Sequence, residues 1–157
     1  MKVLLIQPPA RHIAREDIVV PPLGIAYLAA VLERKGHKVC VLDAFAEMLD
    51  FNSLEERVKL LSPDAVAITG MTPVIDSAYR VAKIARRYAR YVIIGGPHVS
   101  VAGAKVFEQC PDLDYAVQGE GEISFPLLVE ALERNKDISN VPGVITRDFS
   151  NPPSPLI

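Results

Sequence analysis

The chain has 157 residues, of which 50% are hydrophobic and 23% are charged, a composition typical of one globular domain with its own core. Its formal net charge of -2 argues against nucleic acid as a partner, and no apolar run is long enough to suggest a membrane span. The two cysteines, Cys40 and Cys110, suggest neither a disulfide framework nor a metal-binding pair. We therefore expect a reducing, cytoplasmic setting.

Short apolar runs alternate with helical patterns along the whole chain. Buried strands are predicted at residues 3–6, 39–42, 64–69, 91–94 and 115–117. Helices are predicted from about 21 to 36, at 53–61, and at about 74–89, 101–109 and 122–135, with a short edge strand at 144–146. This alternation predicts an α/β fold: a Rossmann-like (flavodoxin-like) three-layer sandwich around a five-stranded parallel sheet of order 2-1-3-4-5.

Three local patterns refine these helices. In the first helix, one face carries Leu23, Ala26, Tyr27, Ala30 and Val31. The third helix carries a basic stripe at positions 83, 86, 87 and 90, which is expected to be a solvated face. The hydroxyl at position 100 is expected to cap the fourth helix. The stretch 10–20 has no clean period, and long loops of this kind are often functional.

Small residues follow the strands at the edge where we expect a ligand. Gly95 and Gly96 end the central strand, where the lack of a Cβ lets a flat ligand approach the backbone. Gln7, residues 69–72, residues 95–98 and residues 119–122 should share this edge, because they follow strands one, three, four and five. The hydroxyls of positions 69 and 72 suit an amide or a phosphate.

Common nucleotide and metal motifs are absent from the sequence. The first strand ends in Gln7-Pro8-Pro9 rather than a glycine-rich fingerprint, and no P-loop occurs. The third strand ends without the acidic residue of a phosphoacceptor domain. The histidines His12, His37 and His98 lack ligand spacing, so no metal ligand is assigned. His98 either contacts a ligand or bonds to nearby backbone.

Two glutamates at the start of the last helix leave two interpretations open. Glu120 and Glu122 are acid–base groups or simply carboxylates that stabilise the first helical turn.

Four motifs together resemble the N-terminal cobalamin-binding domain of cobalamin-dependent radical SAM enzymes. They are the stretch 21–30, Gly70-Met71-Thr72, the stretch 94–98 and Gly119-Glu120-Gly121-Glu122. The resemblance covers residues 3 to about 147. It implies a sheet that holds cobalamin (B12) against the loop edge, with the nucleotide tail in a groove beside the switch point between strands one and three.

The resemblance also implies which residues bind the cofactor. They belong to the motifs above or end one of the first three strands, and no catalytic residue is among them. The expected set is Gln7, Pro22, Leu23, Gly24, Asp43, Thr69, Gly70, Met71, Thr72, Gly95, Gly96, Pro97, His98, Gly119, Glu120 and Gly121.

The sequence departs from this family in two ways. Cobalamin modules with a lower histidine ligand carry D-x-H-x-x-G, whereas the stretch from Asp43 has Phe45 in place of the histidine. An aromatic ring cannot ligate cobalt, so we expect no histidine ligation from this motif. The chain also lacks C-x-x-x-C-x-x-C, so it cannot hold a radical SAM iron–sulfur cluster.

These departures suggest a module rather than a complete enzyme. We expect a cobalamin-binding domain at residues 1–140, and an edge strand with a Pro-rich linker at 141–157 that leads toward a missing catalytic domain. The iron–sulfur cluster and S-adenosylmethionine would belong to that radical SAM domain, in cis or in trans, and the parent enzyme would be a methyltransferase or a related carbon-skeleton enzyme. The alternatives are a flavodoxin-like docking domain that no longer binds a cofactor, or a small enzyme that uses Glu120, Glu122 or His98.

Overall fold

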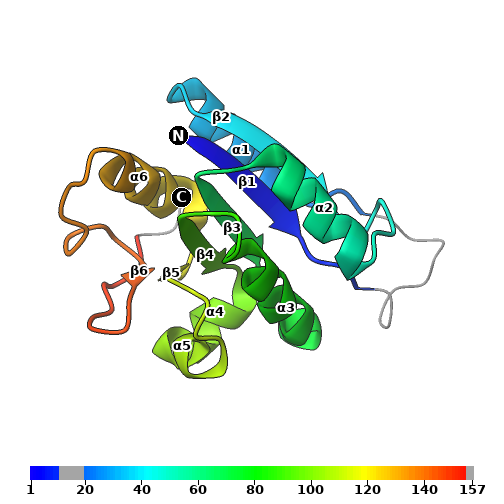
Figure 1. Ribbon diagram of the computed structural model, residues 1–157. Coiled ribbons are helices and arrows are strands. Elements are labelled where there is room, and N and C mark those ends of the chain that lie inside the picture. The colour runs from blue at the N-terminus through cyan, green and yellow to red at the C-terminus, as the bar shows by residue number, and fades with distance from the viewer. Residues whose placement is uncertain (11–19, 155–157) are drawn as a thin grey trace.

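A computed structural model describes residues 1–10 and 20–154, which form one mixed sheet covered by helices (Figure 1). The strands are β1 (Lys2–Gln7), β2 (Lys38–Asp43), β3 (Ala65–Thr69), β4 (Tyr91–Gly95), β5 (Tyr115–Val117) and β6 (Val144–Ile145). The helices are α1 (Leu23–Arg34), α2 (Phe51–Leu61), α3 (Ile75–Ala85), α4 (Pro97–Ala102), α5 (Val106–Gln109) and α6 (Gly121–Glu133), with short 3-10 turns η1 (Thr72–Val74) and η2 (Gly103–Lys105).

The strand order in the sheet is β2-β1-β3-β4-β5-β6. The first five strands are parallel, and β6 pairs antiparallel with β5. The predicted order and the predicted edge strand are confirmed, so the sheet has one strand more than the five-stranded parallel core. Because β1 lies between β2 and β3, the chain changes direction there, as expected for a doubly wound sheet.

Different helices cover the two faces of the sheet. The face under α1 and α6 is packed by Ile25 and Leu32 from one helix and by Phe125 and Leu128 from the other. The opposite face packs against α2, α3, α4 and α5. In Figure 1, α1 lies behind the sheet and α2 and α3 lie in front of it. Between these layers, the three central residues of β4, Val92, Ile93 and Ile94, are buried, as the sequence predicts for a strand covered on both faces.

The apolar face of α1 that the sequence analysis picked out, with Leu23 and Tyr27, is exposed, and a different face of the helix packs on the sheet. Leu23 and Tyr27 are 61% and 62% exposed, whereas Ile25 and Leu32 are 6% and 0% exposed. The prediction was unable to separate these faces because nearly every residue in the first ten positions of this helix is apolar. A period of 3.6 selects a face only where polar residues mark the other one.

The helix after β4 begins earlier than predicted. Gly96 precedes it with φ of 101°, and Pro97 takes the first helical position, where its missing N–H costs nothing. Ser100 therefore does not cap a helix. It lies inside α4, and its hydroxyl accepts a hydrogen bond from the N–H of Gly119 at 3.0 Å. The helix then breaks at Gly103, so two short helices replace the single one that was expected.

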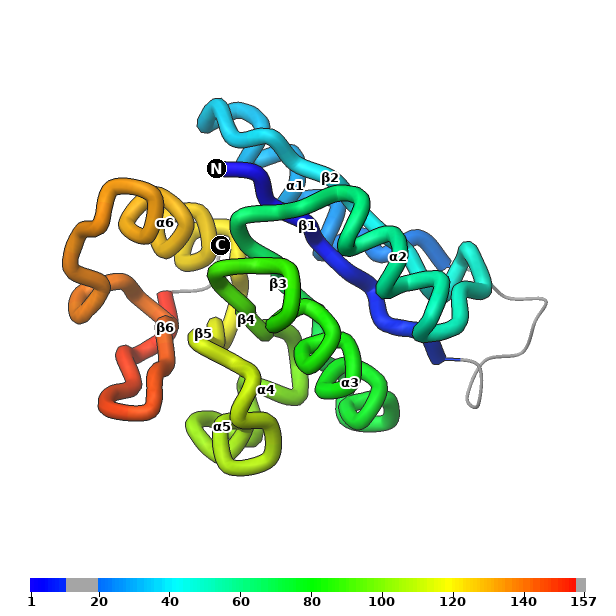
Figure 2. Tube along the Cα trace, viewed as in Figure 1, coloured from blue at the N-terminus to red at the C-terminus, as the bar shows by residue number. Residues whose placement is uncertain are grey.

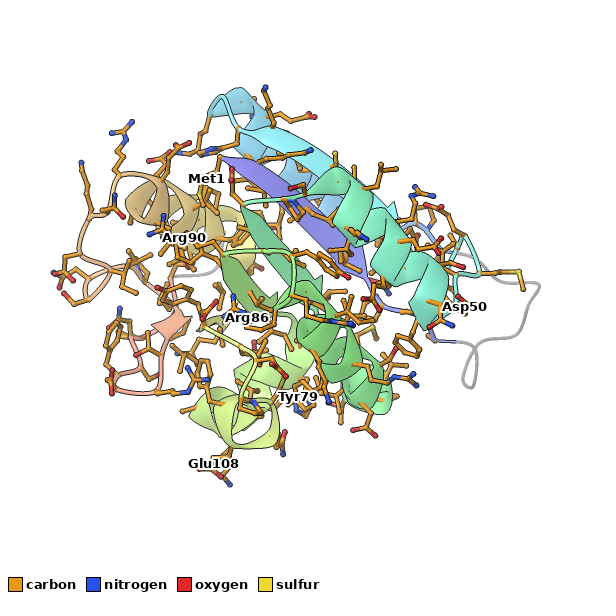
Figure 3. The ribbon with its side chains drawn as sticks, viewed as in Figure 1. Met1, Asp50, Tyr79, Arg86, Arg90 and Glu108 are labelled. Carbon is orange, nitrogen blue, oxygen red and sulfur yellow. The ribbon has the colours of Figure 1, made fainter. Side chains whose placement is uncertain are left out.

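The basic stripe after α3 is only partly a solvated face. Arg86 donates from Nη1 to both carboxylate oxygens of Asp114, at 2.7 and 2.9 Å, and from Nη2 to the carbonyls of Ala89 and Arg90 (Figure 3). Asp114 also accepts the N–H of Val92 at 2.8 Å. Arg86 therefore joins the end of α3 to the starts of β4 and β5.

The loop expected at residues 10–20, with His12, falls almost entirely on residues 11–19, which lie outside the described residues. In the part of the chain that is described, no helix is both long and apolar enough to cross a membrane.

Candidate functional site

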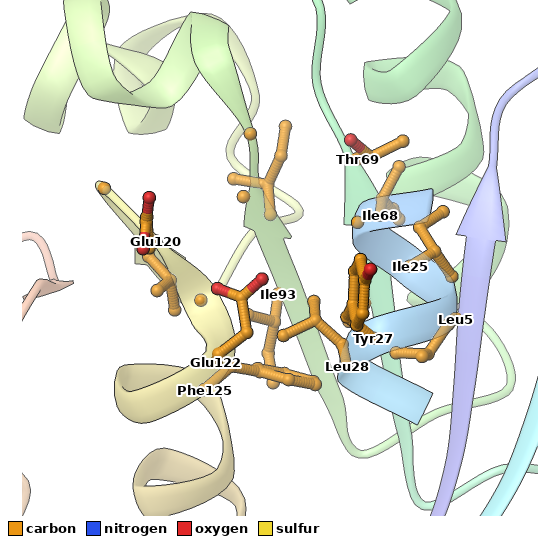
Figure 4. Close-up of a pocket in the computed structure, with 18 of the residues that line it drawn as sticks. Leu5, Ile25, Tyr27, Leu28, Ile68, Thr69, Ile93, Glu120, Glu122 and Phe125 are labelled. Carbon is orange, nitrogen blue, oxygen red and sulfur yellow. The ribbon is translucent and has the colours of Figure 1, made fainter. Parts of the chain in front are cut away.

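A pocket of about 470 Å³ opens at the carboxyl edge of the sheet, between α1 and α6 (Figure 4). Its floor comes from neighbouring strands: Leu5 lies beside Ala67, Ala67 lies beside Ile93, and Val117 lies beside Gly95. These side chains are apolar. The pocket therefore offers an apolar floor at the switch point of the sheet, where open α/β folds place ligands.

The rim beside β4 is narrow because two loops pack backbone to backbone. The N–H of Gly70 donates to the carbonyl of Gly95 at 2.7 Å, and the N–H of His98 donates to the carbonyl of Gly70 at 3.0 Å. A Cβ on Gly96 would lie 2.8 Å from that Gly70 oxygen. With φ of 101°, this position needs glycine for its conformation and for its space.

The loop between β5 and α6 forms the opposite wall of the pocket. Gly119 has φ of 74°, and a Cβ there would lie 3.1 Å from Cβ of Pro153. A Cβ on Gly121 would lie 3.1 Å from Cδ2 of Leu28 on α1. Since Gly119 is also bonded to Ser100, the loop is fixed from α1, α4 and the C-terminal segment.

The segment after β6 packs behind this wall (Figure 2). Gln118 donates from Nε2 to the carbonyl of Asn151 at 2.7 Å, and Asn151 donates from Nδ2 to the carbonyl of Val141 at 2.8 Å. The N–H of Gly143 donates to the carbonyl of Pro152 at 2.7 Å. Residues 151–153 therefore buttress the pocket wall. The proposed division of the chain after residue 140 stays a prediction.

Half of the residues expected at the site line this pocket. Apart from Thr69 at the end of β3, they come from three of the four motifs of the sequence analysis, and they are Gly24, Thr69, Gly95, Gly96, Pro97, Gly119, Glu120 and Gly121. The others lie outside it, and they are Gln7, Pro22, Leu23, Asp43, Gly70, Met71, Thr72 and His98.

Two of the residues outside the pocket have local roles. The Asp43 carboxylate accepts the N–H of Ala46 at 2.9 Å and closes the turn after β2. His98 places Nδ1 3.1 Å from the Thr72 hydroxyl, while its Nε2 is buried without a partner. The ring of Tyr79 packs edge-on against His98, and burial raises the pKa of Tyr79 to about 12. His98 therefore braces the β3 and β4 loops against each other.

The residues that the sequence analysis missed are mostly apolar side chains of the strands and helices. They are Leu5, Ile25, Tyr27, Leu28, Ala67, Ile68, Ile93, Ile94, Val117, Glu122 and Phe125. One signal was available. Side chains along a strand alternate between the two faces of the sheet, so positions two residues apart share a face. Each of the rim positions 7, 69 and 95 therefore shares its face with the apolar residue two places before it: Leu5, Ala67 or Ile93.

A family comparison agrees with this geometry. The family model for the B12 binding domain matches residues 15–129, well over half of the chain. The chain belongs to the B12-binding domain family. Among the described residues of this B12-binding domain, no group of three or more His, Cys, Asp or Glu side chains could hold a metal ion.

Curated relatives of this B12-binding domain are much longer proteins. An uncharacterized methyltransferase, PH0819 of Pyrococcus horikoshii, is 37% identical over 100% of this chain, which covers 36% of that protein. Cytidylyl-2-hydroxyethylphosphonate methyltransferase of Streptomyces wedmorensis is 31% identical over 94% of this chain and 31% of its own length. The chain thus spans about a third of these relatives.

Solved structures share the fold of this B12-binding domain. TsrM from Kitasatospora setae, a radical S-adenosylmethionine methyltransferase solved with cobalamin and a 4Fe-4S cluster, aligns with a TM-score of 0.82 at 24% identity, over 99% of this chain and 29% of that one. OxsB, a cobalamin-dependent S-adenosylmethionine radical enzyme with aqua-cobalamin bound, aligns with a TM-score of 0.84 at 16% identity, over 99% and 22%.

Proposed function

We propose that this B12-binding domain is the cobalamin-binding module of a radical SAM enzyme and that the pocket between α1 and α6 receives the nucleotide tail. The observation that carries the proposal is the pocket itself, which has an apolar floor for a planar base and glycines where the backbone must approach it. Gly24 lines the pocket and has no protein atom within 4 Å of its Cβ position, so the pocket stays open on the side of α1. Because the model of the B12 binding domain matches residues 15–129, cobalamin is the ligand that fits the site best.

The corrin ring would lie over the rim of the sheet. Large apolar side chains are exposed on three helices and one loop: Leu23 on α1, Met71 before η1, Val101 near the end of α4 and Ile123 on α6. Val101 is 88% exposed. Apolar groups gathered in this way favour a broad surface that covers them, which a corrin ring and an adjoining domain supply together.

Cobalt would be bound without a histidine from below. No D-x-H-x-x-G pattern occurs anywhere in the sequence, and Phe45 lies in the turn after β2 rather than in the pocket. His98 also lies outside the pocket lining. We therefore expect bound cobalamin to lack histidine ligation. An electron paramagnetic resonance spectrum of the cob(II)alamin complex that shows coupling to a histidine nitrogen of the protein would contradict this expectation.

Catalysis would need a second domain. The chain has two cysteines, too few for the three-cysteine cluster site of radical SAM enzymes, and it matches only about a third of each longer relative named above. The iron–sulfur cluster and S-adenosylmethionine would belong to that domain, in cis or in trans. The printed names of the relatives favour methyl transfer as the reaction of the parent enzyme.

The other two interpretations have less support. A docking domain without a cofactor would have its groove filled, yet the groove stays open although Tyr27, Leu28 and Phe125 line it. A small enzyme would need its acid–base groups together, but His98 lies outside the pocket that Glu120 and Glu122 line. Cobalamin binding therefore remains the function that the site supports best.

A pocket-blocking variant tests this function. Gly24 lines the pocket, and a Cβ there meets no protein atom within 4 Å, so Gly24→Leu should project into the pocket without straining the fold. Ala30→Leu is the matched control, because Ala30 lies on the same helix, is exposed and does not line the pocket. We expect Gly24→Leu to weaken cobalamin binding about tenfold or more, and Ala30→Leu to leave it unchanged. Equal affinities for both variants would count against the pocket.

A further inference from the structure

Glu122 is a carboxylate in a pocket that is otherwise mostly apolar. It lies in the first turn of α6 and is half-buried. Figure 4 shows its carboxylate reaching into the pocket above the ring of Phe125. Within residues 1–10 and 20–154, no hydrogen bond or ion pair involves Glu122, and α6 has no side-chain cap bond. Helix capping therefore does not explain where this side chain points.

The rest of the described lining supplies no cation for that charge, and its side-chain donors are the hydroxyls of Tyr27 and Thr69. Among the described residues, no lysine, arginine or histidine lines the pocket, and its titratable groups are Tyr27, Glu120 and Glu122. An ionised carboxylate only accepts hydrogen bonds, and partial burial strengthens its need for a donor. A ligand that brings a donor toward Glu122 is therefore favoured in the pocket, and one that brings an anionic group close to Glu122 is disfavoured.

We infer that Glu122 determines the specificity of the pocket for the nucleotide tail, by accepting a hydrogen bond from a donor on that tail. This inference rests on the proposed function. Cobalamin offers two such donors: a ribose hydroxyl, and the free ring nitrogen of the base when that nitrogen is protonated. The tail phosphate is anionic, so a position next to Glu122 would be disfavoured. Recognition of this kind discriminates between corrinoids with and without a nucleotide tail.

The test compares cobalamin with cobinamide, a corrinoid that lacks the nucleotide tail, on the wild-type chain and on Glu122→Gln and Glu122→Ala. Loss of a charge-assisted bond should weaken cobalamin binding about tenfold in Glu122→Ala, equivalent to about 1.4 kcal/mol. Glu122→Gln keeps an acceptor and should lose less. Neither variant should change the affinity for cobinamide. Glu108→Gln is the matched control, since Glu108 lies on α5 in the other helical layer (Figure 3).

Each outcome has one meaning. If the variants weaken both corrinoids equally, or neither, the inference is wrong, even though cobalamin binds. If the wild-type chain fails to bind cobalamin, the proposed function itself is wrong. Urea unfolding of each variant without ligand checks that the variant is folded. A weaker affinity then reflects the lost contact and not an unfolded chain.

A pH series then identifies the donor. The series compares the affinities from about pH 5.5 to about pH 8. If a ribose hydroxyl donates, the affinity ratio of wild type to Glu122→Ala is the same across the range. If the protonated base donates, the ratio is largest at low pH and falls as the base loses its proton. Both results support the role of Glu122.

Discussion

Replacement of Gly96 by alanine should be among the most damaging single changes at the pocket rim. Its φ of 101° and ψ of -179° lie in a region that only glycine occupies readily, and an alanine held there costs about 1–3 kcal/mol. The new Cβ would also lie 2.8 Å from the carbonyl oxygen of Gly70, a backbone atom that cannot rotate away. Overpacking of this kind costs about 1–3 kcal/mol more.

The two costs together lower the free energy of unfolding by about 2–6 kcal/mol, a large part of the roughly 5–15 kcal/mol that stabilises a typical domain. Urea unfolding followed by far-ultraviolet circular dichroism measures this loss, provided the slope against urea concentration stays constant. A loss at the upper end of this range would leave the chain largely unfolded at room temperature if its stability is at the low end, about 5 kcal/mol.

Two other glycines separate the two costs. Gly36 has φ of 86° but no atom within 4 Å of its Cβ position, so Gly36→Ala measures the backbone term, about 1–2 kcal/mol. Gly24 has neither constraint, and Gly24→Ala should stabilise the chain by about 0.4–1 kcal/mol. If Gly96→Ala loses no more stability than Gly36→Ala, the close approach of the two loops does not exist.

Three further predictions follow from other contacts. Asp114→Ala should lower stability by about 2–3 kcal/mol in the same urea assay, and Asp114→Asn should lose less, because it keeps an acceptor for one N–H donor. Burial raises the pKa of the Cys110 thiol, so at pH 8 iodoacetamide should modify it far more slowly in the folded chain than in the chain unfolded in urea. Mass spectrometry measures both rates, and equal rates would contradict the burial of Cys110. Gly119→Ala should be destabilising, and Pro153→Gly should restore about 0.5 kcal/mol or more of that loss in a double-mutant cycle, whereas additive losses would mean that the two residues do not touch.

The order of the strands could be predicted from the sequence because each strand is a short apolar run and each connection is a helix. The central strand is the clearest example, since Val92, Ile93 and Ile94 are apolar on both faces and all three are buried. Because the connection between two parallel strands through a helix is almost always right-handed, few strand orders are then possible. The family resemblance pointed to the same fold from four loop motifs.

What the sequence could not supply depends on contacts between distant residues. Arg86 was expected in solvent because nothing near it in sequence predicts that Asp114 lies within 3 Å. The buried face of α1 was missed because its residues are apolar on nearly all sides.

The candidate site was predicted from glycines and polar groups, so the glycine rim was found and the apolar floor was not. Ala67 and Ile93 are ordinary core residues in the sequence, and only the register of the strands brings them together under the pocket. The close approach of α6 to α1, where a Cβ on Gly121 would lie 3.1 Å from Leu28, likewise joins residues far apart in the sequence.

The most direct test is to mix the purified chain with hydroxocobalamin and separate free from bound corrinoid by gel filtration, with absorbance recorded for both protein and corrin. We expect the corrin absorbance to travel with the protein in stoichiometric amount, with a spectrum that shows the base detached from cobalt. Cobalamin that elutes alone with its free spectrum would contradict the account.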